Sequence, residues 1–356
     1  MLTKNGLIGI LGRSGLAYEL IESGSRWMVL APELGARVMG AGVDEENAFW
    51  TSPKPALASW SEGGNAGGMR TWLAPESGPG AFFFSTNGLR WEVPPSLDPG
   101  NYAPVPAAPH WRSYATALVA EAADAARYPL VITRSVRMAE GASTHPAALV
   151  LDFRHELRNA GASTIDRRVG LWSILQLPCE EAGTVLFGLN PKLRGAEARL
   201  RPYFVAPPPG VMGSADQAAW LRVEGGRRYK VGLAAEDAAG TVLHVRRSRE
   251  GEGNSYLLVV MSFAVQADGV YLDKPAHSGP EALRNGDAVQ AYNDPGRGEL
   301  AFCEIEAHAS AALLEPGESC IADIEVTIAR LGGDEMHAYL SSIPGMEKLP
   351  LSLLPP

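Results

Sequence analysis

The residue types best suited to chemistry gather on one face of a single predicted strand. In segment 299–309, alternation places Glu304, Glu306 and His308 on one side and small or apolar residues on the other. Neighbouring side chains on that face lie about 6.5 Å apart along the strand. Adjacent carboxylates repel and raise one another's pKa, so this arrangement is costly without a purpose. A pair of carboxylates at such a separation also performs acid and base chemistry on sugars.

Two other interpretations of this face stay open. One is a solvated polar face without a function. The other is a metal site with Glu304, Glu306 and His308 as ligands, because mixed oxygen and nitrogen ligands suit a divalent ion such as zinc or manganese. A further histidine or aspartate would be needed to complete the coordination, and the sequence nominates no such partner. We therefore expect no metal and no other cofactor.

A glycine-rich segment, GGNAGGMRTWLAPE at residues 63–76, precedes another group of candidates. A phosphate-binding loop requires a strand, a glycine turn and a helix whose N-terminus meets the phosphate. Pro75 ends any helix here almost at once, so the nucleotide interpretation is weak. The glycines instead predict a tight turn that delivers Arg70, Trp72 and Glu76 to a binding site. Arg70 would either clamp an anionic group or pair with Glu76.

Other strand faces carry side chains that suit a sugar. Trp172 and Gln176 share a face, where an indole stacks on a pyranose and an amide binds hydroxyls, although core packing also explains this tryptophan. Lys230 lies on the polar side of a short strand. It could be a cation of the binding site, but we expect a solvated lysine there. The candidate binding residues are Arg70, Trp72, Glu76, Trp172, Gln176, Lys230, Tyr292 and Asn293.

These candidates need a scaffold of many short strands. The strands expected between Gly, Pro, Asn and Asp turns are Arg26–Ala31, Trp111–Ala120, Leu130–Met138, Ala148–Asn159, Val169–Leu177, Arg228–Leu233, Tyr256–Phe263, Ala288–Asn293, Glu299–Ala309 and Cys320–Ala329. Helices are expected only at Leu16–Glu22 and Asp334–Ser342. The Pro-rich segments 93–109 and 203–213 are expected to cross the surface or to shape a cleft. This pattern predicts an all-β sandwich or barrel.

Composition excludes several classes of function. The chain has 356 residues, 46 % hydrophobic and 20 % charged, which is ample for one large domain over 1–356 with about 25 N-terminal and about 14 C-terminal residues peripheral. A net charge of −9 argues against a nucleic acid or an anionic membrane as partner. Three scattered cysteines form no disulfide framework, and no apolar run is long enough to span a bilayer. We expect a cytoplasmic monomer or homodimer that binds a small-molecule sugar or oligosaccharide.

Six segments resemble, in sequence order, the galactose-mutarotase-like β-supersandwich superfamily, and more narrowly one of its bacterial branches. They are 28–42 (MVLAPELGARVMGAG), 67–76 (GGMRTWLAPE), 155–161 (HELRNAG), 170–178 (GLWSILQLP), 228–233 (RYKVGL) and 289–319, which begins VQAYNDPGRGELAFCEIEAHA. The resemblance spans residues 25–342. It implies a large antiparallel β-supersandwich with a sugar-binding cleft on a concave face. Members include aldose 1-epimerases, hexose-phosphate epimerases, sugar-binding domains of glycosidases and polysaccharide lyase domains.

The resemblance also implies catalytic roles. In the epimerases, a glutamate is the general base on the anomeric hydroxyl, and a histidine protonates the ring oxygen. The glutamate falls within FCEIEAHA, so Glu304 or Glu306 inherits that role. Where the histidine is expected, this sequence has Trp172, and His308 is the candidate replacement acid.

The favoured hypothesis is therefore a mutarotase-like sugar epimerase with a non-standard acid. Two alternatives from other classes stay open. One is a non-catalytic carbohydrate-binding protein that has kept the cleft. The other is a lyase or hydrolase acting on an acidic glycan, with Arg70 and Lys230 binding a uronate.

Overall fold

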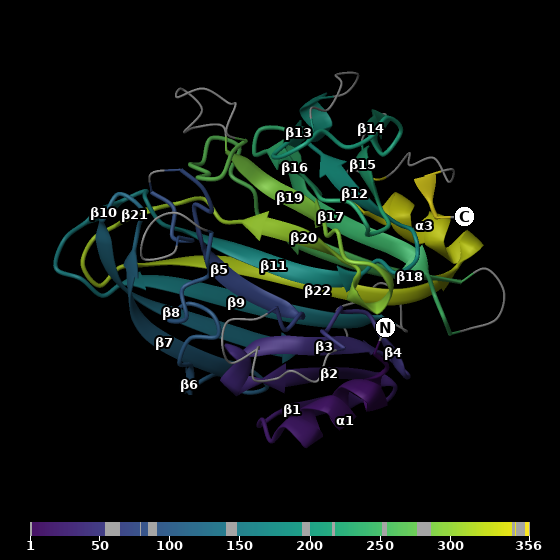
Figure 1. Ribbon diagram of the computed structural model, residues 1–356, viewed down its shortest axis with the longest axis horizontal. Helices are drawn as coiled ribbons and strands as arrows, with labels where there is room; N and C mark the ends of the chain where they lie inside the picture. Colours follow the sequence, from purple (N-terminus) through teal and green to yellow (C-terminus); the bar gives the residue numbers. More distant parts are fainter. Residues whose placement is uncertain are drawn as a thin grey trace.

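Two large antiparallel sheets form most of the protein, as a computed structural model shows (Figure 1). The structure describes residues 2–53, 65–78, 80–84, 91–139, 148–193, 200–215, 218–250, 255–275, 286–343, 346 and 353–355. Each of the two sheets has ten strands within this part of the chain. The all-β sandwich predicted from the sequence is confirmed.

The first sheet has the order β1-β2-β3-β5-β11-β20-β19-β16-β13, and β4 pairs with β3. Its strands are β1 (Glu19–Ser23), β2 (Arg26–Ala31), β3 (Arg37–Val43), β4 (Glu46–Asn47), β5 (Met69–Ala74), β11 (Gly170–Pro178), β13 (Arg201–Pro202), β16 (Tyr229–Ala234), β19 (Asp287–Asn293) and β20 (Phe302–His308). The strands β5, β11, β20, β19 and β16 carry the candidate residues, so this sheet contains the site.

The second sheet has the order β14-β15-β12-β17-β18-β22-β9-β8-β7-β6. Its strands are β6 (Ala103–Pro104), β7 (Arg112–Glu121), β8 (Arg127–Met138), β9 (Leu149–Asn159), β12 (Gly183–Leu189), β14 (Met212–Ala215), β15 (Ala218–Val223), β17 (Ala238–Arg247), β18 (Ser255–Phe263) and β22 (Ser319–Gly332). A small ribbon pairs β10 (Ile165–Asp166) with β21 (Leu313–Leu314). This ribbon lies at one end of the molecule and the helix α3 (Gly333–Ser342) at the other (Figure 1).

The main hydrophobic core lies between the two sheets. Packing in this core determines which face of β20 points away from it. Cys303, Ile305 and Ala307 pack in that core, as the alternation in the sequence predicts. Burying an apolar side chain of this size contributes about 1.5–3 kcal/mol. A slip of one residue in the pairing would carry Glu304 and Glu306 into the core, so the register of β20 is strongly specified.

The expected strands are confirmed, with ends that differ from the sequence prediction by at most three residues. The helix expected at Asp334–Ser342 is confirmed as α3. The helix expected at Leu16–Glu22 is wrong, because Glu19–Ser23 forms the edge strand β1 and pairs with β2. Pairing with a neighbouring strand here outweighs the helical spacing of the apolar residues.

The N-terminal helix, α1 (Lys4–Ser14), was not expected from the sequence. Its three glycines each cost helix stability, which hides the helical pattern. Thr3 caps the N-terminus by accepting a hydrogen bond from the Gly6 amide, and Gly15 ends the helix with φ of 73°. Its residues Leu7 and Leu11 are fully buried in a cluster with Trp27, so tertiary packing offsets the poor propensity. Among the described residues, no helix has both the length and the hydropathy required to cross a bilayer.

Gly67 and Gly68 lie where the glycine-rich segment enters β5. Their φ values are 93° and 72°, which only glycine adopts without strain. A Cβ at Gly68 would lie 2.3 Å from the Val38 carbonyl oxygen, and one at Gly67 would lie 2.3 Å from that of Trp50. The pair thus forms a bend beside the bridge between Gly67 and Thr51, and no hydrogen-bonded turn is assigned to these two residues. Gly63 and Gly64 lie outside the described residues.

We expect Gly68→Ala to destabilise the fold by about 3 kcal/mol or more, since it combines left-handed backbone strain with a collision against β3 backbone. Urea unfolding measures the change. Gly210→Ala is the matched control, because Gly210 has φ of 79° and a Cβ added there would meet nothing within 4 Å, so it should lose only about 1–2 kcal/mol. Equal losses in the two variants would contradict the proposed close approach at Gly68.

Candidate functional site

Strand register brings the polar candidates into one row across four strands. Lys230 of β16 pairs with Tyr292 of β19, Tyr292 pairs with Glu304 of β20, and Glu304 pairs with Gln176 of β11. Residues paired in this way point to the same face of a sheet. Chain segments far apart in the sequence therefore meet at one place on the first sheet.

This row forms the floor of a cleft of about 570 Å³. Eight of the predicted site residues line it: Arg70, Trp72, Glu76, Trp172, Gln176, Lys230, Tyr292 and Glu304. Both Pro-rich segments contribute to its walls through Val93, Asp98, Tyr203 and Phe204. The cleft has the size and mixed polarity of a site for a small organic ligand.

Glu304 is held at the floor through one carboxylate oxygen. Its Oε1 accepts a hydrogen bond from Gln176 Nε2 at 2.7 Å and one from Arg70 Nη2 at 3.0 Å. The residue is 8 % exposed, and Oε2 makes no hydrogen bond with the described residues. One oxygen is thus fixed by two donors, and the other is left to receive a proton or a hydrogen bond from a ligand.

Lys230 is a buried cation between two carboxylates. Its Nζ lies 2.9 Å from Glu76 Oε2 and 3.0 Å from Glu306 Oε2. Burial alone would lower the pKa of Lys230, but Glu306 and Glu76 outweigh it and raise that pKa above its usual value. The lysine expected to be solvated is 3 % exposed, so that expectation is wrong.

Glu306 lies beneath the cleft and does not line it. Its Oε2 also accepts a hydrogen bond from Trp172 Nε1 at 2.7 Å, and Oε1 has no partner among the described residues. Burial raises the pKa of Glu306 to about 8, against the opposing effect of Lys230 and with a further contribution from Glu304. Its contacts hold Trp172 and Lys230 in place.

His308 lies behind Trp172 and does not line the cleft either. The two rings stack with centroids 5.6 Å apart and 13° between their planes. Its Nδ1 lies 3.6 Å from Asp273 Oδ2, and burial lowers the pKa of His308 well below its usual value. A neutral imidazole covered by an indole has no path to a ligand in the cleft, so the structure does not place the candidate replacement acid at the site.

Asn293 faces away from the cleft. Its Oδ1 accepts hydrogen bonds from the amides of Glu224 and Gly225, and its Nδ2 donates to the Arg227 carbonyl. Strand alternation explains this, because Tyr292 faces the cleft and the next residue must face the opposite side. The side chain of Asn293 fixes the loop before β16.

An aromatic surface continues from the floor to the rim of the cleft. Trp172 meets Trp72 edge to face with centroids 5.4 Å apart, and Trp72 lies 6.3 Å from Trp91. The Arg70 guanidinium stacks on Trp72 at 4.3 Å. Arg70 pairs with Glu304, so the ion pair with Glu76 that the sequence left open does not form.

Arg37 and Asp98, which line the cleft, and Asp273, which contacts Glu76, carried little signal in the sequence. Asp98 accepts hydrogen bonds from Trp72 Nε1 and from Arg37, yet it lies in an irregular Pro-rich segment. Arg37 is a charged residue at the start of an otherwise apolar strand. A charged residue in such a strand is a weak indication that it is buried with a partner of opposite charge. Asp273 lies beside Glu76 through a loop contact, with Oδ1 accepting from the Glu76 amide at 2.7 Å.

The open possibility of a metal site finds no support in the part of the chain that the structure describes. No group of three or more His, Cys, Asp or Glu residues there has a geometry that could hold a metal ion. Glu304 is bound to Arg70 and Gln176, Glu306 to Lys230 and Trp172, and His308 is turned behind Trp172.

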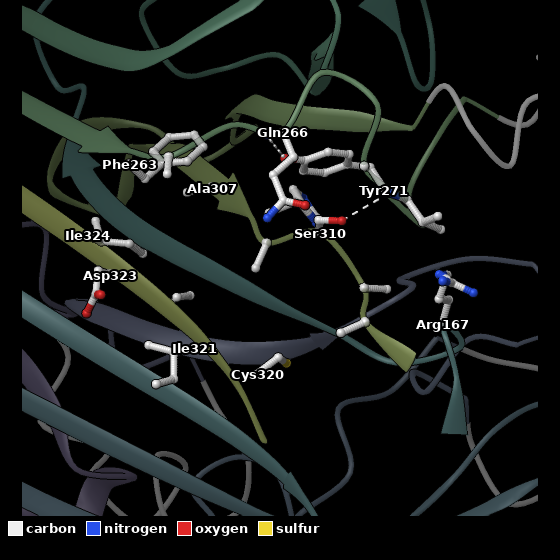
Figure 2. A pocket seen from close by; sticks show the side chains of 18 of the residues that line it. Arg167, Phe263, Gln266, Tyr271, Ala307, Ser310, Cys320, Ile321, Asp323 and Ile324 are labelled. Carbon is white, nitrogen blue, oxygen red and sulfur yellow. Dashed lines mark hydrogen bonds between the residues drawn. The ribbon is translucent and has the colours of Figure 1, made fainter. Parts of the chain in front are cut away.

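A second pocket, of about 680 Å³, opens between the sheets near the ends of β20 and β22 (Figure 2). Two of its charged side chains, those of Arg167 and Asp323, lie on opposite sides in Figure 2. Asp323 is already paired with Arg154. A binding site requires a few polar groups directed at one point, and the cleft on the first sheet meets that requirement better.

The fold is the one found in galactose mutarotase-like proteins, since solved structures of such proteins match most of this chain. A proposed aldose 1-epimerase from Escherichia coli K12 matches with a TM-score of 0.53 and 14 % identity over 89 % of this chain and 100 % of that chain. A galactose mutarotase-like protein from Lactobacillus casei ATCC 334 matches with a TM-score of 0.53 and 9 % identity over 88 % and 100 %. The Slr1438 protein of Synechocystis sp. PCC 6803 matches with a TM-score of 0.54 and 11 % identity over 88 % and 96 %. At these identities the likeness establishes the fold alone.

The chain belongs to the family of unknown function DUF6786, which matches residues 14–335. No curated protein matches the sequence. The superfamily resemblance inferred from the sequence is therefore confirmed at the level of the fold.

Asp273 gives the site a testable pH dependence. Burial, with a contribution from Glu76, raises the pKa of Asp273 to about 7, against about 3.9 in an unfolded chain. The folded state then binds the proton more tightly, so this stabilisation is complete below about pH 4 and is lost as the pH rises to about 7. We expect Asp273→Asn to flatten the fall in unfolding free energy over this range by about 1 kcal/mol per pH unit.

Urea unfolding at several pH values measures this slope. Asp323→Asn is the matched control, the same carboxylate-to-amide change at a side chain that is 60 % exposed, where a surface ion pair contributes little to stability. An identical slope in wild type and Asp273→Asn would show that Asp273 is ionised throughout.

Proposed function

We propose that this protein binds a sugar in the cleft on the first sheet, and that Glu304 acts there as the general base of an aldose-epimerase type of reaction. One observation carries the proposal. The Glu304 carboxylate is fixed through Oε1 by Arg70 and Gln176, while Oε2 is left for a ligand at the floor of an aromatic cleft. A proposed aldose 1-epimerase and a galactose mutarotase-like protein share the fold.

In the proposed reaction, Glu304 removes the proton of the anomeric hydroxyl. The electron pair of that O–H bond forms the C1 carbonyl, the bond between C1 and the ring oxygen breaks, and the ring oxygen takes up a proton. The ring then closes on the other face of the carbonyl: the former ring oxygen attacks C1 and releases its hydroxyl proton to solvent, while the carbonyl oxygen takes back the proton from Glu304, which gives the other anomer. A positioned base contributes about 10²–10⁴-fold to such a step.

Lys230 is the residue we assign to the ring oxygen. Lys230 is one of the residues that line the cleft, and its acidic neighbours raise its pKa above the usual value despite burial. A fixed cation next to an oxygen that gains negative charge stabilises the transition state. Because this lysine releases its proton reluctantly, the proton that the ring oxygen finally takes up comes through solvent in the open cleft.

A non-catalytic sugar-binding protein is the second candidate. It is favoured by the position of His308 behind Trp172, since no histidine lines the described cleft. A lyase or hydrolase for acidic glycans is less favoured, because Arg70 and Lys230 are already paired with Glu304, Glu306 and Glu76. A uronate would have to compete with these carboxylates.

The proposal is tested by exchange NMR of anomer interconversion on a panel of aldoses. We expect Glu304→Gln to reduce the catalysed rate by about 10²–10⁴-fold, while sugar binding persists, because an amide keeps an acceptor for Arg70 and Gln176. Glu121→Gln is the matched control, since that side chain is 66 % exposed on the second sheet.

The outcomes separate the candidate functions. Sugar binding by wild type without any acceleration of interconversion would identify a binding protein. Equal rates for wild type and Glu304→Gln would remove Glu304 from the mechanism. An unsaturated product that absorbs in the near ultraviolet would favour the lyase.

A further inference from the structure

The aromatic surface that a sugar could stack on lies at the rim of the cleft and not at its floor. Trp172 and Trp72 are 2 % and 6 % exposed, whereas Trp91 is 50 % and Phe204 is 45 % exposed. Both exposed rings line the cleft, where an aromatic ring offers an apolar face to a ligand. The floor therefore offers polar groups to a ligand, and the rim offers apolar faces.

Both rim rings are held in place by other side chains. Trp91 stacks on the buried Phe83 with centroids 5.8 Å apart and 11° between the planes. Phe204 carries the Arg228 guanidinium over its ring at 4.4 Å. Rings fixed in this way lose little conformational freedom when a ligand stacks on them, which favours binding.

The two rings flank the floor on opposite sides. Trp91 contacts Trp72 on β5, and Phe204 lies two residues after the end of β13. Between β5 and β13 lie β11, β20, β19 and β16. β5 and β13 are therefore five strand spacings of about 4.8 Å apart, about 24 Å along the sheet, and the floor between these strands is wider than one pyranose ring.

The volume of the cleft leads to the same conclusion. A pyranose takes up roughly the space of six waters at about 30 Å³ each, on the order of 200 Å³. The cleft has about 570 Å³, so one sugar at Glu304 would leave more than half of it to water.

We propose that the ligand of this cleft is an oligosaccharide of at least two units, with one sugar at Glu304 and a neighbouring sugar stacked on Trp91. This inference rests on the proposed sugar-binding function and extends it to the class of ligand. Because Glu304 acts on a free anomeric hydroxyl, the sugar at Glu304 is the reducing end, and the chain extends from it across β5 toward Trp91. Phe204 with Arg228 offers a second apolar surface at the opposite rim.

The test compares sugars of different length by isothermal titration calorimetry. The probes are glucose and galactose and their α- and β-linked di-, tri- and tetrasaccharides. We expect the oligosaccharides to bind wild type about tenfold or more tightly than the monosaccharides. Trp91→Ala should weaken oligosaccharide binding by about tenfold and change monosaccharide binding by less than about twofold. Trp91→Phe should restore most of the loss, and Val119→Ala, an equally exposed apolar position on β7, should change neither.

Each other outcome overturns the inference. Equal affinity for monosaccharides and oligosaccharides would show that the rim binds no second sugar. The proposed sugar-binding function would not be affected by that result. Equal weakening of both by Trp91→Ala would place Trp91 in a single-sugar site. Absence of binding to every probe, long or short, would contradict the proposed function itself and this inference with it.

Discussion

The pairing of β20 between β11 and β19 is the constraint on which the site depends. One face of β20 supplies Cys303, Ile305 and Ala307 to the core between the sheets, and the other carries Glu304, Glu306 and His308. Because the side-chain period of a strand is two, core packing on one face fixes the position of every polar group on the other. The apolar face thus determines where Glu304 meets Gln176 and Tyr292.

The electrostatics of the site follow from that placement. Three carboxyl groups, those of Glu76, Glu306 and Asp273, lie around the single ammonium of Lys230 in the described structure. Burial makes full ionisation of all three unfavourable, and the pKa values of Glu306 and Asp273 are raised accordingly. Glu304 is separate from this group, since Arg70 and Gln176 hold it at the cleft. The polar face of β20 therefore has two parts. Glu304 faces the ligand cleft, whereas Glu306 belongs to a buried network that holds Trp172 in place.

The aromatic residues have a similar division of roles. Trp172 and Trp72 pack at the floor, where they donate hydrogen bonds to Glu306 and Asp98 and support Lys230 and Arg70. Trp91 and Phe204 lie at the rim with much of their surface exposed. Tryptophan suits the first role because its ring fills space while its N–H satisfies a buried carboxylate. Most of the stacking surface available to a ligand thus comes from loop residues and not from the strands.

The sequence by itself determined the all-β class, the positions of most strands and the face to which each β20 residue points, because period-two alternation is a local property. Eight of the site residues predicted from the family resemblance and from side-chain chemistry line the cleft. The sequence did not show that His308 lies behind Trp172. It also did not show that Lys230 is buried between Glu76 and Glu306, or that Arg70 pairs with Glu304. Those contacts join residues up to 234 positions apart, and only strand order and register decide which of them meet. The helix α1 and the strand β1 were missed for the same reason, since packing on Trp27 and pairing with β2 outweigh their local propensities.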